Sequence, residues 1–379
     1  MPAACWSLPE LLESPSILLM LGAFLLMLGP LIIIHELGHY YAGRIFGVRA
    51  LTFSIGIGKE LWHRIDKRGT RWRVAAIPLG GYVLFAGDAD ASSKPDPALE
   101  GASAEELKGT LPGAPLWQRA LIVLAGPFAN LLVAVLIYTG FAMSYGVPFA
   151  PPVVAGFSQN SAAQQAGIQI GDRIVSIDGA QIDDFPDIAP RVALYPGQVV
   201  QVGIDRSGRA LEFPVRIALV KETDSFGNES TRGLLGIAGG AGELRPVGPL
   251  GAVEFAVGAT GEKLRIIAVG LKQIVFGERS LREMGGLPKT AKASGEMLSL
   301  GWVVFLEFAA FVSINLAFIN LLPIPTLDGG HLAFYAAEAV RRRPLGLRSQ
   351  EFAFRIGMAF VIAVALFVNI NDLVSLFFK

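Results

Sequence analysis

The segment Ile32-Ile-Ile-His-Glu-Leu-Gly-His39 carries a metal-binding signature at the end of an apolar run. On a helix, side chains four positions apart lie nearly one above the other, so His35 and His39 can direct imidazole nitrogens at one ion. Glu36 projects from the adjoining face, where a carboxylate can serve as general base for water attack on a carbonyl. The spacing therefore predicts a zinc-dependent hydrolase, with two histidine ligands and Glu36 as the base.

The position of this motif in the chain is as informative as its spacing. Residues 17–34 form an apolar stretch of 18 residues, and the motif continues the same helix. Such a stretch can cross most of a bilayer. Ionisable side chains at membrane depth are costly and are usually functional. A chance match, with the histidines merely lining a helix interface, would leave this cost unexplained.

The composition indicates an integral membrane protein that also has a soluble portion. The 379 residues are 52% hydrophobic and 17% charged, and 32 basic residues balance 32 acidic ones. A net charge of zero gives no indication of a nucleic-acid partner. The single cysteine, Cys5, excludes an internal disulfide framework and a cysteine-rich metal site.

Four membrane spans are expected, at 17–34, 116–145, 300–322 and 351–368. The first is expected to be retained and not cleaved as a signal peptide, because no lysine or arginine precedes it. Eight lysines or arginines lie within residues 44–73, and four arginines lie between the third and fourth spans. By the positive-inside rule, both basic loops should be cytoplasmic, and the long segment between the second and third spans should lie outside.

The first basic loop has the pattern of a small sheet. Residues 50–58, 60–65 and 71–77 read as short strands. A sheet beside the motif could offer an edge to an extended substrate, or it could be an ordinary hairpin packed on helix ends, and the sequence leaves both interpretations open. Residues 88–115 are polar and rich in alanine, serine and proline, which is typical of a flexible linker.

Residues 152–221 predict a small domain of strands and helices. A short helix over 161–167, a Gly-Asp turn into a strand, a second helix over 187–194 and two further strands follow one another. This order resembles a PDZ domain of the bacterial protease-associated kind, and the alternative is an unrelated small β domain. Residues 222–249 should be loop, and 253–276 should be an amphipathic helix at the outer interface.

The end of the third span carries candidates for the third metal ligand, which the His-Glu motif does not supply. The sequence from Asn315 to His331 combines two asparagines, a Pro-x-Pro pair and an Asp-Gly-Gly turn, which at membrane depth need protein or water as partners. Catalytic zinc needs three protein ligands. Asp328 is the preferred third ligand, because the glycines after it let the chain fold close. His331 and Glu307 remain rivals.

Together these motifs resemble the site-2 protease family of intramembrane zinc metalloproteases, and most closely its bacterial RseP-like (regulator of sigma E protease) branch. The resemblance rests on His35–His39 after a span, Gly126-Pro-Phe-Ala-Asn130 in the next span, the PDZ-like domain and the stretch from Asn320 to Gly330. It covers nearly the whole chain. The best-known members carry two PDZ domains in tandem, whereas this sequence shows one.

The resemblance implies a role for each site residue. The Zn²⁺ ligands would be His35, His39 and Asp328, and the catalytic base would be Glu36. The substrate-binding residues would be Asn315, Asn320, Pro323 and Pro325. The loop ending in Pro78–Val83 is similar to the family's membrane-reentrant β element.

The expected fold is a polytopic α-helical membrane protein of about four transmembrane helices, with a membrane-associated β element and an inserted extracytoplasmic PDZ domain of α+β fold. Residues 1–146 would hold the first two helices, the motif and the cytoplasmic hairpin, and 152–221 the PDZ-like domain. Residues 222–299 would form an extracytoplasmic linker and the interfacial helix, and 300–379 the last two helices.

The expected function is zinc-dependent cleavage of peptide bonds in or near transmembrane helices, in regulated intramembrane proteolysis. Substrates would be single-pass membrane proteins already trimmed by another protease, such as anti-sigma factors or signal-peptide remnants. The expected location is the cell inner membrane, in contact with the lipid bilayer, with the active site toward the cytoplasm and the PDZ domain in the periplasm.

Two other classes of protein share some of these sequence features. A transporter that uses intramembrane histidine and aspartate as an ion path would show internal hydropathy repeats, and the sequence shows none. An idle PDZ scaffold would lack Glu36 or a ligand, and all are present.

Overall fold

The structure, a computed structural model, describes residues 15–90, 96–99, 101–223, 229–240, 242–277, 280, 285–343 and 345–377. The chain divides into two units. We call Met1–Ile137 with Gly285–Asp372 the helical unit, and Tyr138–Met284 with Leu373–Lys379 the strand-rich unit. Each unit is described by itself.

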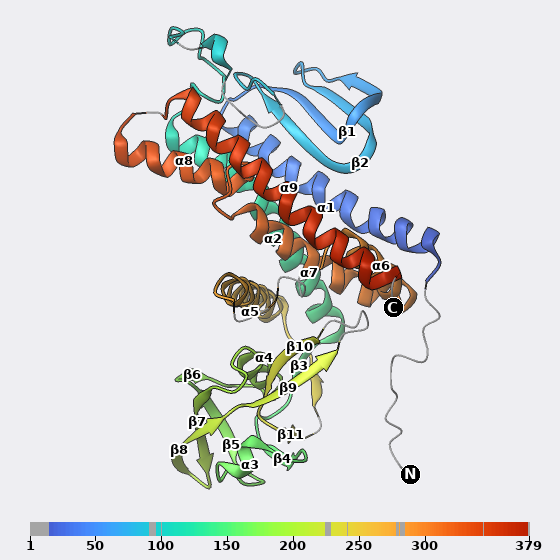
Figure 1. The fold of residues 1–379 in the computed structure, drawn as a ribbon, viewed down its shortest axis with the longest axis vertical. Helices are drawn as coiled ribbons and strands as arrows, with labels where there is room; N and C mark the ends of the chain where they lie inside the picture. The colour runs from blue at the N-terminus through green and yellow to red at the C-terminus, as the bar shows by residue number, and fades with distance from the viewer. Residues whose placement is uncertain are drawn as a thin grey trace. The chain divides into compact units, whose positions relative to one another are not determined.

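Among the described residues, four helices are long and apolar enough to cross a membrane. They are α1 (Ile17–Ile45), α2 (Leu116–Tyr145), α7 (Trp302–Asn320) and α9 (Leu347–Phe377) (Figure 1). The prediction of four spans is confirmed. Helix α1 continues through the His-Glu motif, as expected, whereas α9 is longer than the expected 351–368 at both ends.

Two shorter helices, α6 (Leu287–Ser299) and α8 (Asp328–Arg341), complete the helical unit. A Cβ atom at Gly295 would lie 3.1 Å from Met20, so α6 packs closely on the start of α1. The Gly286 amide donates to Asp372 Oδ2 at 2.7 Å, and Lys289 pairs with the same carboxylate at 3.3 Å. The segment 285–299, expected in an outer linker, therefore folds with the helical unit.

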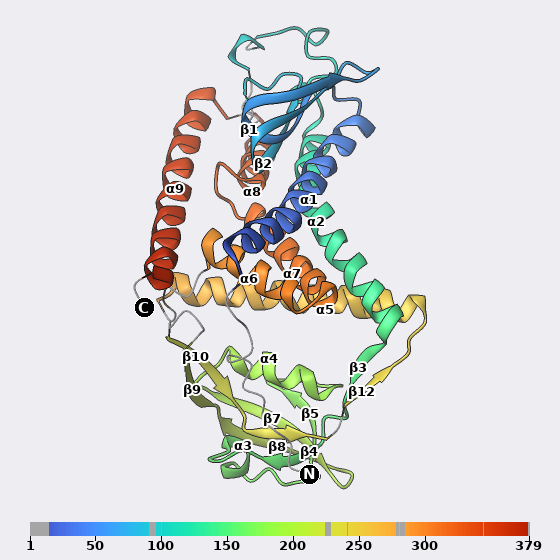
Figure 2. The same ribbon diagram turned by 90° about the vertical axis from the view of Figure 1, so that its right-hand side faces the viewer.

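The first basic loop forms an antiparallel hairpin of two long strands, β1 (Ala50–Ile65) and β2 (Arg71–Phe85). Both strands bend, so that Phe53 of β1 pairs with Val83 on one side and with Trp72 on the other. The Phe53 and Trp72 rings stack with centroids 4.5 Å apart, and Tyr40 of α1 packs edge-on against both. The predicted strand regions are confirmed, but 50–58 and 60–65 form one strand, and the strand expected over 71–77 continues to Phe85. Figure 2 shows the hairpin beside the C-terminal end of α1.

The loop between β2 and α2 is tied to the hairpin, and the prediction of a flexible linker over 88–115 is wrong for its described residues. Thr110 and Leu111 are buried. The Leu111 amide donates to Ala86 O at 2.8 Å, and the Arg49 amide donates to Gly109 O at 2.9 Å. Backbone hydrogen bonds thus hold a segment whose composition alone suggests mobility. A short 3-10 helix, η2 (Pro97–Leu99), lies within it.

The strand-rich unit contains an antiparallel sheet of four strands in the order β6-β5-β7-β8. Its strands are β5 (Arg173–Ile177), β6 (Ala180–Gln181), β7 (Val199–Arg206) and β8 (Arg209–Arg216). The short helices predicted within the domain are confirmed as α3 (Ala162–Gln165) and α4 (Ile188–Ala193), the latter preceded by η3 (Phe185–Asp187). Apolar side chains from the sheet and both helices form one buried core.

This unit continues beyond residue 221, and the loop predicted over 222–249 is wrong in its described parts. β9 (Ala218–Thr223) pairs with β10 (Glu229–Leu234), and β11 (Ile237–Gly239) pairs with β4 (Val154–Phe157). Leu235, between β10 and β11, is buried in the core of the sheet. β12 (Glu243–Arg245) pairs with β3 (Val147–Phe149), near the point where the chain enters the unit from α2.

The last element of the strand-rich unit is α5 (Pro249–Val275), which confirms the predicted amphipathic helix. It is not among the four candidate spans of the described chain. The Gln273 amide of α5 donates to Leu194 O at 2.6 Å and so fixes the helix to the end of α4.

An ion pair between the buried Asp172 and the partly exposed Arg206 holds the turn before β5. Asp172 accepts hydrogen bonds from Nε and Nη2 of Arg206, both at 2.7 Å, and from the Gln169 amide, also at 2.7 Å. The hydrogen bonds from Arg206 lower the pKa of Asp172, although burial acts in the opposite direction.

Asp172→Asn should destabilise the strand-rich unit by about 2 kcal/mol at neutral pH, because the charged acceptor is lost. The folded pKa is lower than the unfolded value of about 3.9. The stabilisation is therefore fully present above about pH 4 and is lost as the pH falls through the folded pKa. Hydrogen exchange of the β5 and β7 amides in the full chain measures the effect. The exposed Asp183→Asn is the control, and equal exchange in the two variants would contradict the prediction.

Candidate metal centre

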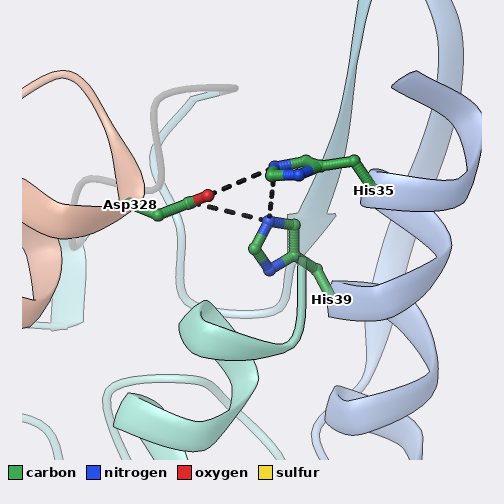
Figure 3. Close-up of side chains that lie close together, drawn as sticks. All are labelled: His35, His39 and Asp328. Carbon is green, nitrogen blue, oxygen red and sulfur yellow. Dashed lines mark hydrogen bonds and ion pairs between the residues drawn. The ribbon is translucent and has the colours of Figure 1, made fainter. Parts of the chain in front are cut away.

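His35 and His39 lie on one face of α1, one turn apart, and both are buried. Their Nε2 atoms are 3.2 Å apart. Asp328, the first residue of α8, lies opposite them, with Oδ2 3.2 Å from His35 Nε2 and Oδ1 3.5 Å from His39 Nε2. Figure 3 shows the two rings and the carboxylate pointing toward one another. The fold thus brings together the two histidines and the aspartate that the sequence singled out.

The chemistry of this group fits a zinc ion. The three side chains offer two imidazole nitrogens and a carboxylate oxygen, all within 4.8 Å of one another. Two nitrogens bound to one tetrahedral zinc lie about 3.3 Å apart, close to the separation of the two Nε2 atoms. Two buried imidazoles that face each other in this way also need a proton or a cation between them, and the carboxylate beside them stabilises that positive charge.

Helix α2 supports the histidine pair through three positions four residues apart. His39 Nδ1 donates to the carbonyl of Ile122 at 2.9 Å, which leaves its Nε2 lone pair free to bind a metal. A Cβ atom at Gly126 would lie 2.2 Å from His39 Nε2, so the imidazoles lie directly against the helix backbone. Asn130, one turn further on, has Nδ2 3.3 Å from His35 Nδ1.

Close backbone packing and one ion pair hold α8 in place. Cβ atoms at Gly329 and Gly330 would lie 2.3 Å from backbone carbonyls of the preceding turn, as expected for a chain that folds back closely. Arg119 of α2 donates to both carboxylate oxygens of Glu338 on α8, at 2.5 and 3.2 Å. Its guanidinium also lies 5.1 Å from the centre of the Tyr335 ring. Asp328 is therefore fixed relative to α2.

A cavity of about 330 Å³ opens beside the three side chains and is lined by residues of the helical unit alone. Glu36 lines it next to the histidines. A Cβ atom at Gly81 of β2 would lie 3.2 Å from Glu36 Cγ, so the strand lies against this carboxylate. The candidate base, the three candidate ligands and one strand segment, Gly80–Val83, thus share one cavity.

The other predicted residues divide between the cavity and its surroundings. Asn320 and His331 line the cavity, although His331 is not part of the ligand group. Asn315 donates to Phe311 O of its own helix and does not line the cavity. Pro323 and Pro325 do not line it either. The rival ligand Glu307 is exposed on α7, away from the group.

Sequence reasoning missed the groups that orient the candidate ligands. The Gly126–Asn130 motif contributes only to the family resemblance, although a glycine and an asparagine four apart in a span already mark one helix face. The sequence gives a weaker indication of the ion pair between Arg119 and Glu338. An arginine in the first turn of a span needs either a charged partner or a place at the membrane interface, and the amino-acid sequence alone does not distinguish the two.

Comparison with known proteins agrees with this site. The model of peptidase family M50 matches residues 23–364. "Putative zinc metalloprotease Atu1380" of Agrobacterium fabrum is 44% identical over 358 residues, which cover 93% of this chain and 95% of that protein. Metalloprotease MmpA of Caulobacter vibrioides is 35% identical over 381 residues, which cover 94% and 96% of the two chains.

The matched region contains the His-Glu motif, Asp328, all the residues that line the cavity and most of the four candidate spans. The two relatives named above align with this chain along nearly their whole length. The resemblance to the site-2 proteases is confirmed by this match, and the protein is a zinc-dependent, multi-pass membrane protease. The chain belongs to peptidase family M50.

Proposed function

We propose that this metalloprotease cleaves peptide bonds in or near transmembrane helices of anchored proteins, in regulated intramembrane proteolysis. One observation carries the proposal: Glu36, His35 and His39 are part of α1, which is itself a candidate membrane span. A site at that depth is accessible to membrane segments and protected from folded soluble proteins. Single-pass proteins, such as anti-sigma factors or signal-peptide remnants, are substrates of this kind.

In this mechanism His35, His39 and Asp328 hold zinc. Bound zinc supplies Lewis acidity, which polarises a carbonyl and makes water more acidic. Glu36 takes a proton from the attacking water and passes it to the leaving amine. The position of Glu36 on the cavity wall, one residue from a candidate ligand, supports this role.

The substrate must unwind locally, because a helix hides its carbonyls in internal hydrogen bonds. The freed backbone groups then need new partners. The segment Gly80–Val83 of β2 lines the cavity and could pair with an extended substrate strand. The Asn320 amide on the same cavity could accept or donate a further hydrogen bond. We assign no direct contact to Asn315, Pro323 or Pro325, whose proposed contribution is to shape the turn before Asp328.

The strand-rich unit is proposed to act as a PDZ-like filter on the outer side of the membrane. The order of its helices and strands supports the PDZ-like part of this role. The outer location is supported by the basic charge of the β1–β2 hairpin, which favours a cytoplasmic hairpin and a cytoplasm-facing cavity, because the candidate span α2 comes between the hairpin and the strand-rich residues in the chain. A compact domain there could exclude partners that still carry bulky outer domains. Substrates would then reach the site after trimming by another protease.

Glu36→Gln should lower cleavage about 10²- to 10⁴-fold and leave zinc bound, because the change removes the base and no candidate ligand. The assay is cleavage of a tagged single-pass membrane protein by purified enzyme, with and without a zinc chelator. Metal content is measured in parallel. A wild-type cleavage rate in the variant would exclude Glu36 as the base, and cleavage of soluble proteins only would contradict the intramembrane substrate.

Asp328→Ala should lower both zinc content and activity, because one of three ligands is lost. His331→Ala should keep its zinc, because His331 lies outside the ligand group. Metal analysis of the two purified variants, with wild type as reference, measures the difference. The opposite result, zinc retained without Asp328 and lost without His331, would give the third position to His331.

Removal of the filter should widen the range of substrates. β3 and β12 pair through Phe149 and Glu243, so residues 151–241 can be replaced by a linker of about three residues without separating these strands. The shortened enzyme should still cleave trimmed substrates and should also cleave versions with their outer domains attached. The same deletion combined with Glu36→Gln is the control for contaminating proteases. Loss of cleavage of both substrate forms would show that the domain is needed for folding or recruitment.

A further inference from the structure

Helix α2 contacts both candidate histidine ligands, but through different chemical groups. His39 Nδ1 faces the carbonyl of Ile122, which can only accept a hydrogen bond. His35 Nδ1 faces the side-chain amide of Asn130, at 3.3 Å. An amide offers either a donor or an acceptor, depending on which of its two ends is turned toward the ring. The carbonyl therefore fixes the proton of His39, whereas Asn130 can set that of His35.

The side chain of Asn130 is fully buried in the bundle. Its backbone carbonyl accepts a hydrogen bond from Ser313 of α7 at 2.8 Å, which fixes this turn of α2 against the third span. Within the described chain, Asn130 Oδ1 is buried and has no hydrogen-bond partner. A half-turn of the amide exchanges Oδ1 and Nδ2 without changing its shape. In either orientation one of the two amide atoms lacks a protein partner, so the protonation of His35 Nδ1 determines which amide atom faces the ring.

A neutral imidazole carries one proton and one lone pair on its two nitrogens. His35 Nε2 points at Asp328 and His39, so this nitrogen must supply the lone pair to a bound metal. The proton is then on Nδ1, and the group that faces Nδ1 must accept it. Metal-bound histidines commonly donate their second N–H in this way, and the acceptor tunes metal affinity.

We infer that Asn130 is a positioning residue for the metal site: its Oδ1 accepts the Nδ1 proton of His35 and keeps His35 Nε2 free to bind the metal. Together with Ile122 O, it makes one face of α2 the acceptor for both imidazoles. The inference rests on the metal site proposed above. The competing explanation is that Asn130 only packs α2 against its neighbours.

The test compares two substitutions at this position. Asn130→Asp keeps an acceptor in every orientation, whereas Asn130→Leu keeps the approximate volume and removes the acceptor. Each full-length variant is purified in detergent and stripped of metal. Zinc affinity is then measured by competition with a chromophoric chelator. The visible spectrum of the cobalt-substituted protein reports the ligand geometry independently of activity.

Asn130→Leu should weaken zinc binding about 10- to 100-fold. Asn130→Asp should stay within a few-fold of wild type and keep its cobalt spectrum. Asn315→Leu removes an amide whose hydrogen bond among the described residues is to Phe311 O of α7 itself, so it should keep wild-type zinc affinity. A melting curve at saturating zinc checks that each variant is folded. If Asn130→Leu does not fold, the comparison of wild type with Asn130→Asp still tests the inference, because an amide that donates to His35 would be lost with aspartate and zinc affinity would fall.

Two results would overturn the inference. One is wild-type zinc affinity in Asn130→Leu, and the other is a loss in Asn130→Asp as large as the loss in Asn130→Leu. Asp328→Ala separates this failure from a failure of the proposed site. If Asp328→Ala binds zinc as wild type does, the metal site itself is wrong, and the role of Asn130 fails with it.

Discussion

The burial of two imidazoles and a carboxylate inside an apolar bundle is the constraint on which this structure depends. Polar side chains at such a position need partners, because neither lipid nor apolar protein can hydrogen-bond them. His35, His39 and Asp328 supply partners for one another and a donor set for zinc. The backbones must come close for this to happen, which is why glycine stands at 126 and at the start of α8. Side chains larger than hydrogen at these positions would separate the ligands.

Helix α2 is the element against which both halves of the site are aligned, although it contributes no candidate ligand. The Ile122 carbonyl and the Asn130 amide face the histidines, and Arg119, one turn earlier, is paired with Glu338 on α8. The same helix thus contacts the histidine pair and, through an ion pair, the helix that begins with Asp328. A shift of α2 would therefore displace both the histidine pair and Asp328, so the polar residues of α2 help to determine the geometry of the metal site.

The features that could be predicted from the sequence are those that depend on local spacing. The histidines four apart, the apolar spans and the turn residues of the strand-rich unit are all local, and the structure agrees with each. The loop predicted over 222–249 was wrong in part because two of its strands pair with distant partners, β11 with β4 and β12 with β3. Its other strand, β10, pairs with the neighbouring β9. Helix α6 was missed because Lys289, Gly295 and several polar residues hide a helix that is stabilised by packing on α1. The preference for Asp328 over His331 came from the glycines that follow it, and the contacts of Asp328 with both histidines agree with that preference.

The place of the motif along α1 reconciles two opposing needs of intramembrane hydrolysis. The ligands require apolar cover, but hydrolysis requires water, which is scarce at the bilayer centre. His35 and His39 lie in the second half of α1, and Tyr40 and Arg44 follow within little more than one turn. The basic β1–β2 hairpin packs there, and its segment Gly80–Val83 lines the cavity. In the proposed orientation, water would approach from the hairpin end, and the apolar first half of α1 would face its helical neighbours and lipid. Gly81 lies against Glu36, so the strand proposed to hold an unwound substrate also borders the proposed base. In the proposed mechanism, substrate pairing and proton transfer would therefore take place at one wall of the cavity.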